Sequence, residues 1–325
     1  MTGPSAAGYI SLGPTVGPKP DSSTLNFPKG DTRANNVTVR LGSGGVLGAV
    51  YVSGRPGATT QFVFDVTGWF TPDASGATYH PQTPVRLLDT RSGNGLSGPF
   101  MTGAPQAFQV TGRSGVPDNA TAVTGNLTVV GQTSAGYAFV GPTAAAAPLS
   151  STLNVPLGDT RANGVSVQLG PGGELGAVWI GKPGSTTQLV FDLTGYFTAD
   201  ATGLSYFALQ PIRVLDSRAW LGASGALWTN EPTTVAVADS GLVSPSATAI
   251  SGNLTIVGQS SVGYAFMGPT ASPSPSSSTL NAPKGDIRAN GLDVALSPTG
   301  EVGLVWVGRS GSWANLILDV TGYWK

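Results

Sequence analysis

Apolar and polar residues alternate along much of this chain. Val165, Val167 and Leu169 alternate with polar neighbours, and the corresponding stretches 37–41 and 292–296 keep the apolar positions while the intervening residues vary. Side chains of a β-strand point alternately to its two faces, so this pattern predicts strands with one buried face. No window combines helical periodicity with helix-capping residues. The pattern therefore predicts an all-β chain.

Turn signals separate the predicted strands. Gly-rich stretches such as 42–45, 170–173 and 308–311 lie between apolar runs, as in hairpins. Many short strands joined by such turns are typical of a sandwich or barrel, and we expect antiparallel, jelly-roll-like β-sandwiches. Eight strands are predicted in the middle of the chain, near 85–90, 106–110, 121–131, 136–142, 151–155, 164–169, 175–181 and 187–197.

The whole pattern repeats after about 127 residues. The segment from Gly136 to Thr143 returns at 263–270 and, in variant form, at 8–15. By contrast, the segments that open the repeat occur only twice, at 84–91 with 125–131 and at 211–218 with 252–258. The chain therefore contains two complete modules and one half-module. The expected domains are a half-module plus linker (1–79), a complete β-module (80–206) and a second complete β-module (207–325).

The half-module has three interpretations. It is a piece of a longer natural chain, or its missing strands come from another molecule, or it folds alone as a small five-stranded sheet. A sandwich without half of its strands has open edges, and such edges recruit strands from other molecules. The second interpretation would make assembly part of the function.

Composition excludes several classes of protein. Only 10% of residues are charged and the net charge is -1, so we expect no binding to nucleic acid. The absence of Cys removes disulfides, thiolate metal sites and a Cys nucleophile. No apolar run reaches the roughly 20 residues that span a bilayer, so we expect no membrane insertion. Residues 1–5 lack the features of a signal peptide, and we expect any secretion leader to lie outside this chain.

Asp and Arg residues recur at the same positions in each module. One set comprises Asp31, Arg33, Asp159, Arg161, Asp286 and Arg288, and the other comprises Asp89, Arg91, Asp216 and Arg218. Charges copied into every module behave as structural elements, because Asp caps turns and Arg–Asp pairs are stable when partly buried. We therefore assign structural roles to both sets.

No constellation of residues supports a reaction. The single histidine, His80, lies in a predicted linker and has Phe207 as its repeat equivalent, which indicates packing. One histidine excludes a Ser-His-Asp triad and a multi-His metal site. A glycosidase with two carboxyl groups is the least favoured interpretation. We expect no catalytic residue, no metal and no cofactor.

Six of the seven tryptophans fall into two groups. Trp179 and Trp306 align with Tyr51, and Trp69 aligns with Tyr196, so these repeated aromatic residues predict core packing. Three others, Trp220, Trp228 and Trp313, have no aromatic equivalent in the preceding module. They are candidates for contact with a glycan or with a neighbouring module or subunit, since aromatic residues are enriched at interfaces.

Six short motifs together resemble a known tandem module. They are Arg-Leu-Leu-Asp-Thr-Arg (86–91), Asn-Leu-Thr-Val-Val (126–130), Gly-Tyr (136–137), Ser-Thr-Leu-Asn (151–154), Ala-Asn (162–163) and Asp-Leu-Thr-Gly-Tyr-Phe (192–197). The combination is similar to a β-repeat of secreted and cell-surface proteins of actinobacteria and Chloroflexi-like bacteria. That repeat is often appended to cell-wall hydrolases such as N-acetylmuramoyl-L-alanine amidases. The resemblance implies an extracellular or cell-surface β-module and no catalytic residue, because none of an amidase's His ligands is present.

The leading expectation is a non-catalytic structural or adhesive repeat protein that assembles through its incomplete module. Its partners would then be further copies of itself, as a homo-oligomer or filament, or other surface proteins. The alternative is a module that binds cell-wall or environmental glycans through Trp220, Trp228 and Trp313.

Overall fold

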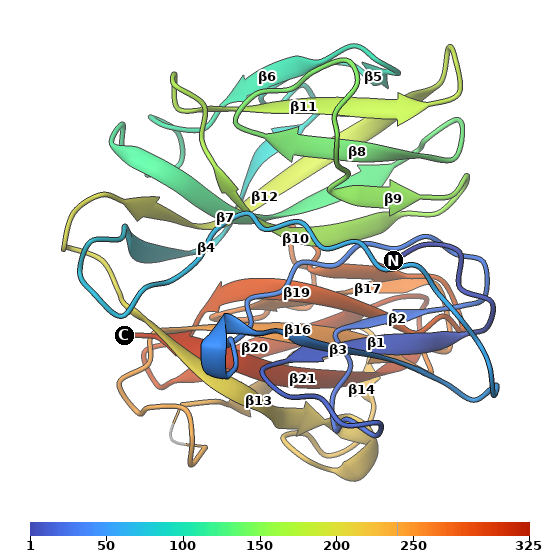
Figure 1. Cartoon of the computed structure of the whole chain (residues 1–325), viewed down its shortest axis with the longest axis vertical. Coiled ribbons are helices and arrows are strands. Elements are labelled where there is room, and N and C mark those ends of the chain that lie inside the picture. Colours follow the sequence, from blue (N-terminus) through green and yellow to red (C-terminus); the bar gives the residue numbers. More distant parts are fainter. Residues whose placement is uncertain (239) are drawn as a thin grey trace. The chain divides into compact units, whose positions relative to one another are not determined.

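A computed structural model describes residues 1–238 and 240–325 (Figure 1). These residues form five small sheets of antiparallel strands, which confirms the all-β class. The helical elements within the described ranges are two 3-10 turns, η1 (Ser43–Gly45) and η2 (Ser217–Ala219).

The chain divides into two compact units. One contains residues 64–205, and the other combines residues 1–63 with residues 206–325. The three expected domains, 1–79, 80–206 and 207–325, therefore become two units, because the half-module packs with the C-terminal module.

The unit of residues 64–205 contains the first complete module. Its strands are β4 (Thr78–Asp89), β5 (Phe100–Met101), β6 (Gln106–Gln109), β7 (Ala120–Val130), β8 (Gly136–Gly141), β9 (Leu153–Val155), β10 (Arg161–Gln168), β11 (Glu174–Gly181) and β12 (Thr186–Thr198). One sheet has the order β10-β7-β12-β4, with β5 added to β12, and the other has the order β6-β11-β8-β9. All eight strands predicted in this module are confirmed, and β5 is an additional short one.

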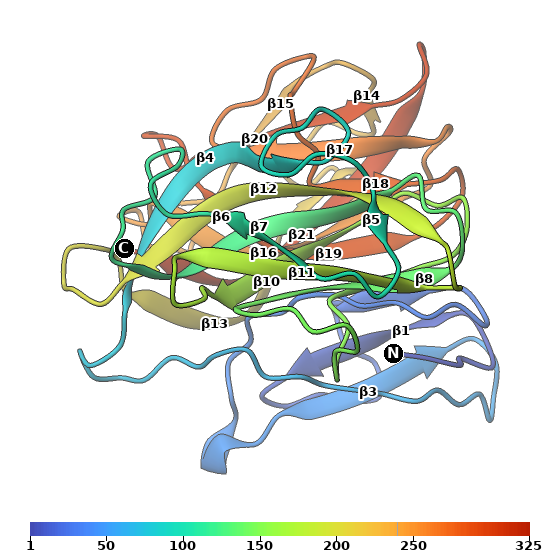
Figure 2. The ribbon, with the colours of Figure 1, turned by 90° about the horizontal axis from the view of Figure 1, so that it is seen from above.

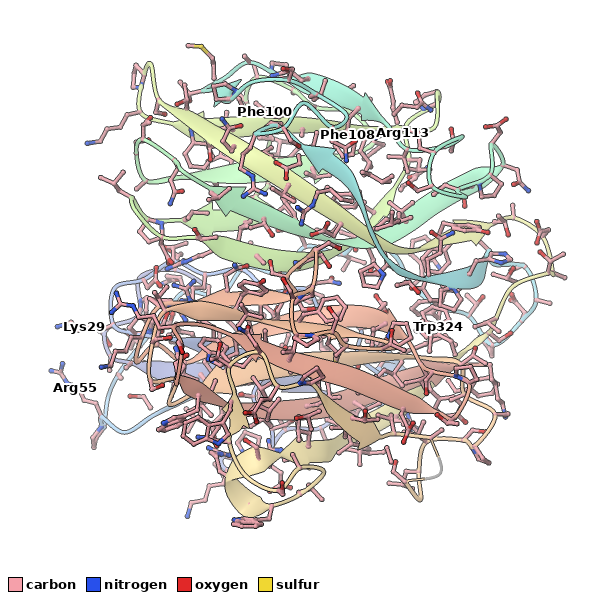
Figure 3. All side chains as sticks on the ribbon, turned by 180° about the vertical axis from the view of Figure 1, so that it is seen from behind. Lys29, Arg55, Phe100, Phe108, Arg113 and Trp324 are labelled. Carbon is pink, nitrogen blue, oxygen red and sulfur yellow. The ribbon has the colours of Figure 1, made fainter. Side chains whose placement is uncertain are left out.

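Apolar side chains from both sheets form one core. Leu127 and Phe191 come from the first sheet, and Phe108 and Trp179 come from the second, and all are almost fully buried. Figure 3 shows Phe108 and the equally buried Phe100 within this module. Burial of this apolar surface is the dominant stabilising contribution to the module.

The second complete module repeats this arrangement. Its strands are β13 (Tyr206–Asp216), β14 (Leu227–Trp228), β15 (Thr233–Ala236), β16 (Ala249–Val257), β17 (Gly263–Gly268), β18 (Leu280–Ala282), β19 (Arg288–Ala295), β20 (Glu301–Val307) and β21 (Trp313–Trp324). The sheet orders are β13-β21-β16-β19, with β14 added to β21, and β15-β20-β17-β18. Leu318 of the first sheet and Trp306 of the second meet in its core.

The half-module forms a three-stranded sheet, not the five-stranded sheet that was one interpretation. Its strands β1 (Gly8–Gly13), β2 (Leu25–Phe27) and β3 (Gly48–Ser53) have the order β2-β1-β3. They are the repeat equivalents of β8, β9 and β11. Figure 2 shows β1 and β3 side by side. A small core of Met1, Ile10, Leu12, Leu25 and Phe27 lies under this sheet.

Two stretches of the half-module form no strand although their sequences predict one. Residues 37–41 correspond to β10, and residues 61–70 correspond to β12. In the complete modules, β10 pairs with β7, and β12 pairs with β7 and β4. The half-module has no counterpart of β7 or β4. Without a partner for its backbone groups, an alternating sequence does not become a strand.

The glycine of the Asp-(Val/Leu)-Thr-Gly-(Trp/Tyr) motif accommodates a buried tyrosine. A Cβ on Gly195 would lie 2.5 Å from Cζ of Tyr79 and still closer to its hydroxyl oxygen. That hydroxyl is 2.8 Å from Thr124 Oγ1 and donates to the carbonyl oxygen of Thr194 at 3.3 Å. At Gly68, the same position in the half-module, no atom lies within 4 Å of an added Cβ.

Candidate functional site

The repeated charges of the first complete module form an ion-pair cluster, in which two buried aspartates are held by two partly exposed arginines. Arg86 on β4 donates from Nε to Asp192 Oδ1 at 2.9 Å and from Nη2 to Oδ2 at 3.2 Å. Asp89 accepts from Arg86 at 3.2 Å and from Arg91 at 2.7 and 2.8 Å. Asp192 lies on β12 and is 2% exposed, so this cluster joins two neighbouring strands of one sheet.

The second complete module builds the same cluster. Arg213 bonds both carboxylate oxygens of Asp319, at 2.8 and 3.1 Å, and Arg218 bonds both oxygens of Asp216. Hydrogen bonds from Arg218 lower the pKa of Asp216, and those from Arg91 lower the pKa of Asp89.

The pKa values of the aspartates on the central strands shift in the opposite direction. Burial raises the pKa of Asp192 and of Asp319, and the facing guanidinium group of Arg86 or Arg213 opposes that shift. The two carboxyl groups of each cluster therefore have pKa values that move apart, although both are held by arginine.

The other repeated set closes a turn in each module. Arg33, Arg161 and Arg288 each donate from Nε to the aspartate two residues earlier, at 2.7, 2.8 and 2.7 Å. Each also donates from Nη1 to a backbone carbonyl seven residues earlier, on Asn26, Asn154 and Asn281. The predicted structural role of these charges fits this geometry, which ties β2, β9 and β18 to the turns that follow them.

Arg33 makes two further contacts, with the C-terminal module. Within the unit formed by residues 1–63 and 206–325, its guanidinium group pairs with Asp286 and donates to the carbonyl oxygen of Ile287 at 2.8 Å. Asn35 donates to Asn253 Oδ1 at 2.9 Å and accepts from the backbone N–H of Gly291 at 2.7 Å. The half-module thus docks on the C-terminal module of its own chain.

This arrangement leaves the repeated carboxylates poorly suited to acid–base chemistry. Asp89, Asp192, Asp216 and Asp319 are buried and are each bonded by a guanidinium group. A general acid or base must reach a substrate proton, and these groups face arginine instead.

The structure brings two of the three candidate tryptophans together. Trp228 on β14 is the direct antiparallel partner of Trp313 on β21. Directly opposed residues share one face of a sheet with Cβ atoms about 4.5–5.5 Å apart. Trp228 is 50% exposed and Trp313 is half-buried. In the first complete module the same register pairs Met101 with Thr186.

Trp220 occupies an unfavourable backbone conformation. It follows η2 with φ of 61° and is 75% exposed. Its repeat equivalent, Gly93, has φ of 77°. A bulky residue at positive φ is an outlier that costs of order 1–3 kcal/mol and is commoner at functional positions than elsewhere. No contact joins Trp220 to the Trp228–Trp313 pair in the described part of the chain.

Two aromatic predictions are corrected or refined by the structure. Trp179 and Trp306 are fully buried as predicted, but Trp69 is 80% exposed and not in a core. The reason is that its segment, unlike the equivalent β12, has no sheet around it. His80 lies in β4 and not in a linker, and it stacks on Tyr196 at 4.8 Å. Phe207 stacks on Tyr323 in the same way.

The described residues contain neither a candidate metal centre nor a candidate membrane-spanning helix. Residues 1–238 and 240–325 contain no group of three or more His, Asp or Glu side chains that could hold a metal ion. No helix within those ranges is long and apolar enough to cross a membrane.

The asparagines that join the half-module to the C-terminal module were not among the predicted site residues. Asn35 belongs to the repeated Ala-Asn motif, and Asn253 belongs to the repeated Gly-Asn-Leu-Thr motif. Asn253 donates to the carbonyl oxygen of Ser23 at 2.7 Å, in addition to its contact with Asn35. Recurrence of both residues was visible, but nothing in the sequence indicated that one copy would bind another.

The five sheets and the repeated motifs define this chain as an all-β repeat protein, and comparison with known proteins adds no family to that class. No family model matches the chain, and no curated protein matches it. One similar solved structure is the N-terminal CBM22-1-CBM22-2 tandem domain of Xyn10C from Paenibacillus barcinonensis. It is 9% identical, with 74% of this chain and 98% of that chain covered, at a TM-score of 0.19. A likeness this low carries no argument about fold or ligand.

Proposed function

We propose that this chain is a non-catalytic structural or adhesive repeat protein of the cell surface. The observation that supports this most is the reuse of the same Arg–Asp contacts in each module. The charged residues that a reaction would need are bonded to one another inside or between strands. Exposed surfaces, not a reactive centre, then carry the function.

In this proposal each complete module is a jelly-roll-like β-sandwich. With β5 set aside, the strands of the first module have the sheet orders first-eighth-third-sixth and second-seventh-fourth-fifth. That is the strand order of a jelly roll. The alternative for five small sheets is a five-bladed propeller. The shared core of each sheet pair favours sandwiches.

Independent folding distinguishes these two arrangements. A fragment of residues 78–205 should unfold cooperatively by itself if the module is a sandwich with its own core. A blade set taken from a propeller would be incomplete and should not give a cooperative transition. Circular dichroism during thermal unfolding measures this.

The cell-surface location rests on the resemblance of the repeated motifs to modules of secreted bacterial proteins. Protease treatment of intact source cells, followed by immunoblotting, tests it. Loss of the protein without lysis supports surface exposure, and full protection until lysis contradicts it.

Assembly is tested by light scattering on the purified chain over a concentration series, with negative-stain microscopy of the same samples. Defined oligomers, filaments or sheets support the structural function. A monomer at every concentration would overturn the assembly part of the proposal and leave adhesion to other molecules.

Glycan binding is the second candidate, and the Trp228–Trp313 pair favours it. Two aromatic rings on one sheet face, with Trp228 50% exposed and Trp313 half-buried, form a platform of the kind that stacks on sugar rings. A glycan array with the intact chain and with Trp228→Ala tests this. Met101→Ala, at the equivalent position of the other module, is the matched control. Binding that survives Trp228→Ala would contradict the candidate.

A further inference from the structure

One loop of the C-terminal module contains hydroxyl groups that the other copies of the repeat lack. This loop, residues 269–279 between β17 and β18, reads Pro-Thr-Ala-Ser-Pro-Ser-Pro-Ser-Ser-Ser-Thr. The corresponding loop of the first complete module, residues 142–152, reads Pro-Thr-Ala-Ala-Ala-Ala-Pro-Leu-Ser-Ser-Thr. Ser272, Ser274 and Ser276 therefore stand where the first complete module has two alanines and a leucine, and where the half-module has glycine, lysine and aspartate.

The last hydroxyl group of the same loop serves the fold. Thr279 Oγ1 accepts a hydrogen bond from the backbone N–H of Met267 at 2.9 Å, which fixes the loop to β17. The equivalent threonines, Thr152 and Thr24, accept from backbone N–H groups in their own modules at 3.0 Å. A hydroxyl group that the fold requires is therefore present in each copy.

Ser272, Ser274 and Ser276 differ from that threonine. All three are exposed, and no hydrogen bond joins their hydroxyl groups to another residue in the described part of the chain. Ser272 and Ser274 are each followed by proline, which restricts the preceding residue to extended conformations. An exposed loop of small and polar residues is accessible to enzymes. These hydroxyl groups are therefore open to covalent modification without loss of a contact within the module.

The composition of the loop favours an uncharged modification. Residues 269–279 contain no Arg, Lys or His. A phosphoserine is stabilised by arginine clusters or by helix N-termini, and phosphates on alternate residues would repel one another. Neutral sugars have no such cost, and segments rich in Ser and Thr with proline are typical of O-glycosylation.

We propose that Ser272, Ser274 and Ser276 are acceptors for O-linked sugars, which a glycosyltransferase attaches from an activated sugar on a phosphate carrier. The serine Oγ attacks the anomeric carbon, and the bond from that carbon to the phosphate oxygen breaks. The electron pair leaves with the phosphate carrier, and the hydroxyl proton passes to a base of the transferase. The chain supplies only the acceptor and needs no catalytic residue of its own. This inference does not depend on assembly, adhesion or glycan binding by the chain.

Intact-mass spectrometry of the full chain from its source cells is the primary test. Its mass should exceed that of the unmodified sequence by whole sugar residues, and fragmentation should place them on residues 269–279. The triple variant Ser272→Ala with Ser274→Ala and Ser276→Ala should lose the added mass. Its thermal unfolding should match that of the parent chain, because the substituted side chains are exposed. Ser310→Ala, at an exposed serine that precedes glycine and not proline, is the matched control and should keep the added mass.

A transplant tests whether the loop sequence is sufficient. Four substitutions at exposed positions make residues 142–149 identical to residues 269–276: Ala145→Ser, Ala146→Pro, Ala147→Ser and Leu149→Ser. The same fold already carries this sequence in the C-terminal module, so the variant should unfold as the parent does. When it is purified from the source cells, it should carry additional sugars on this second loop.

Three results would overturn the inference. One is an unmodified chain from the source cells. Another is added mass that a phosphatase removes, since the modification would then be phosphate. The third is added sugar that persists in the triple variant, because other residues would then be the acceptors. In all three cases the proposed surface function stands, since protease accessibility on cells and oligomeric state are measured separately.

Discussion

Replacing Gly195 with alanine places a methyl group where the ring of Tyr79 lies. The added Cβ would be 2.5 Å from Cζ, and Tyr79 is fully buried, so the ring has little room to move. Inserting a methyl group into a packed core costs about 1–3 kcal/mol. Weakening the two hydrogen bonds of the tyrosine hydroxyl adds about 0.5 kcal/mol each, the lower end of the usual contribution, because both are distorted and not lost. We expect a loss of about 2–4 kcal/mol in the free energy of unfolding of this module.

Differential scanning calorimetry of the full chain measures this loss. For a unit of this size, we expect the transition of residues 64–205 to move down by roughly 5–15 °C. Gly68→Ala is a matched control, because it changes the same motif where no atom lies within 4 Å. It should change the free energy of unfolding by no more than about 0.5 kcal/mol.

Gly322→Ala repeats the perturbation in the C-terminal module, where the added Cβ would lie 2.6 Å from Tyr206 Cε2. It should destabilise the other unit by a similar amount. Equal effects of Gly195→Ala and Gly68→Ala would refute the reasoning, because the cost could not then come from contact with tyrosine, which Gly68 does not make.

Three further predictions concern charge and strain. Arg33→Ala should destabilise the unit of residues 1–63 and 206–325 by about 3–5 kcal/mol in urea unfolding, because it removes the ion pairs of a buried guanidinium group with Asp31 and Asp286 and its hydrogen bonds to two backbone carbonyl groups. Carboxyl NMR titration should show Asp192, whose pKa burial raises, taking up its proton at a higher pH than Asp89, whose pKa Arg91 lowers. The contribution of Asp89 to stability is then present above its unfolded pKa and is lost as the pH falls through its folded pKa. Ionisation of Asp192 has the opposite effect, because it reduces stability as the pH rises through the raised pKa of that carboxyl group. Asp89→Asn should therefore reduce the loss of stability that the chain shows as the pH falls. Trp220→Gly should leave the free energy of unfolding unchanged or raise it by up to about 1 kcal/mol, since glycine removes the cost of positive φ.

Much of the candidate site was predictable from repetition. The Arg–Asp sets were assigned structural roles because each module carries them, and each lies in the same local geometry. The pairing of Trp228 with Trp313 was not predictable, because 85 residues of sequence do not indicate which strands will lie side by side. The ion pair between Arg33 and Asp286 was not predictable either, since both residues belong to copies of one motif and the sequence does not indicate that one copy contacts another.

Local sequence determined the strand positions, the turns and the repeat. Alternation of apolar residues specifies which face of a strand is buried, and this depends on neighbours two residues apart. These properties are local, so they are the same in each copy.

Only the tertiary structure determined which copies of a motif form a strand. The motif that contains Asp192 is a central strand, and the nearly identical motif that contains Asp65 is exposed chain without a strand. A β-strand completes its hydrogen bonds on other strands, so its formation depends on partners distant in the sequence. The half-module lacks those partners, and for that reason the same residues fold in one place and remain outside a sheet in the other.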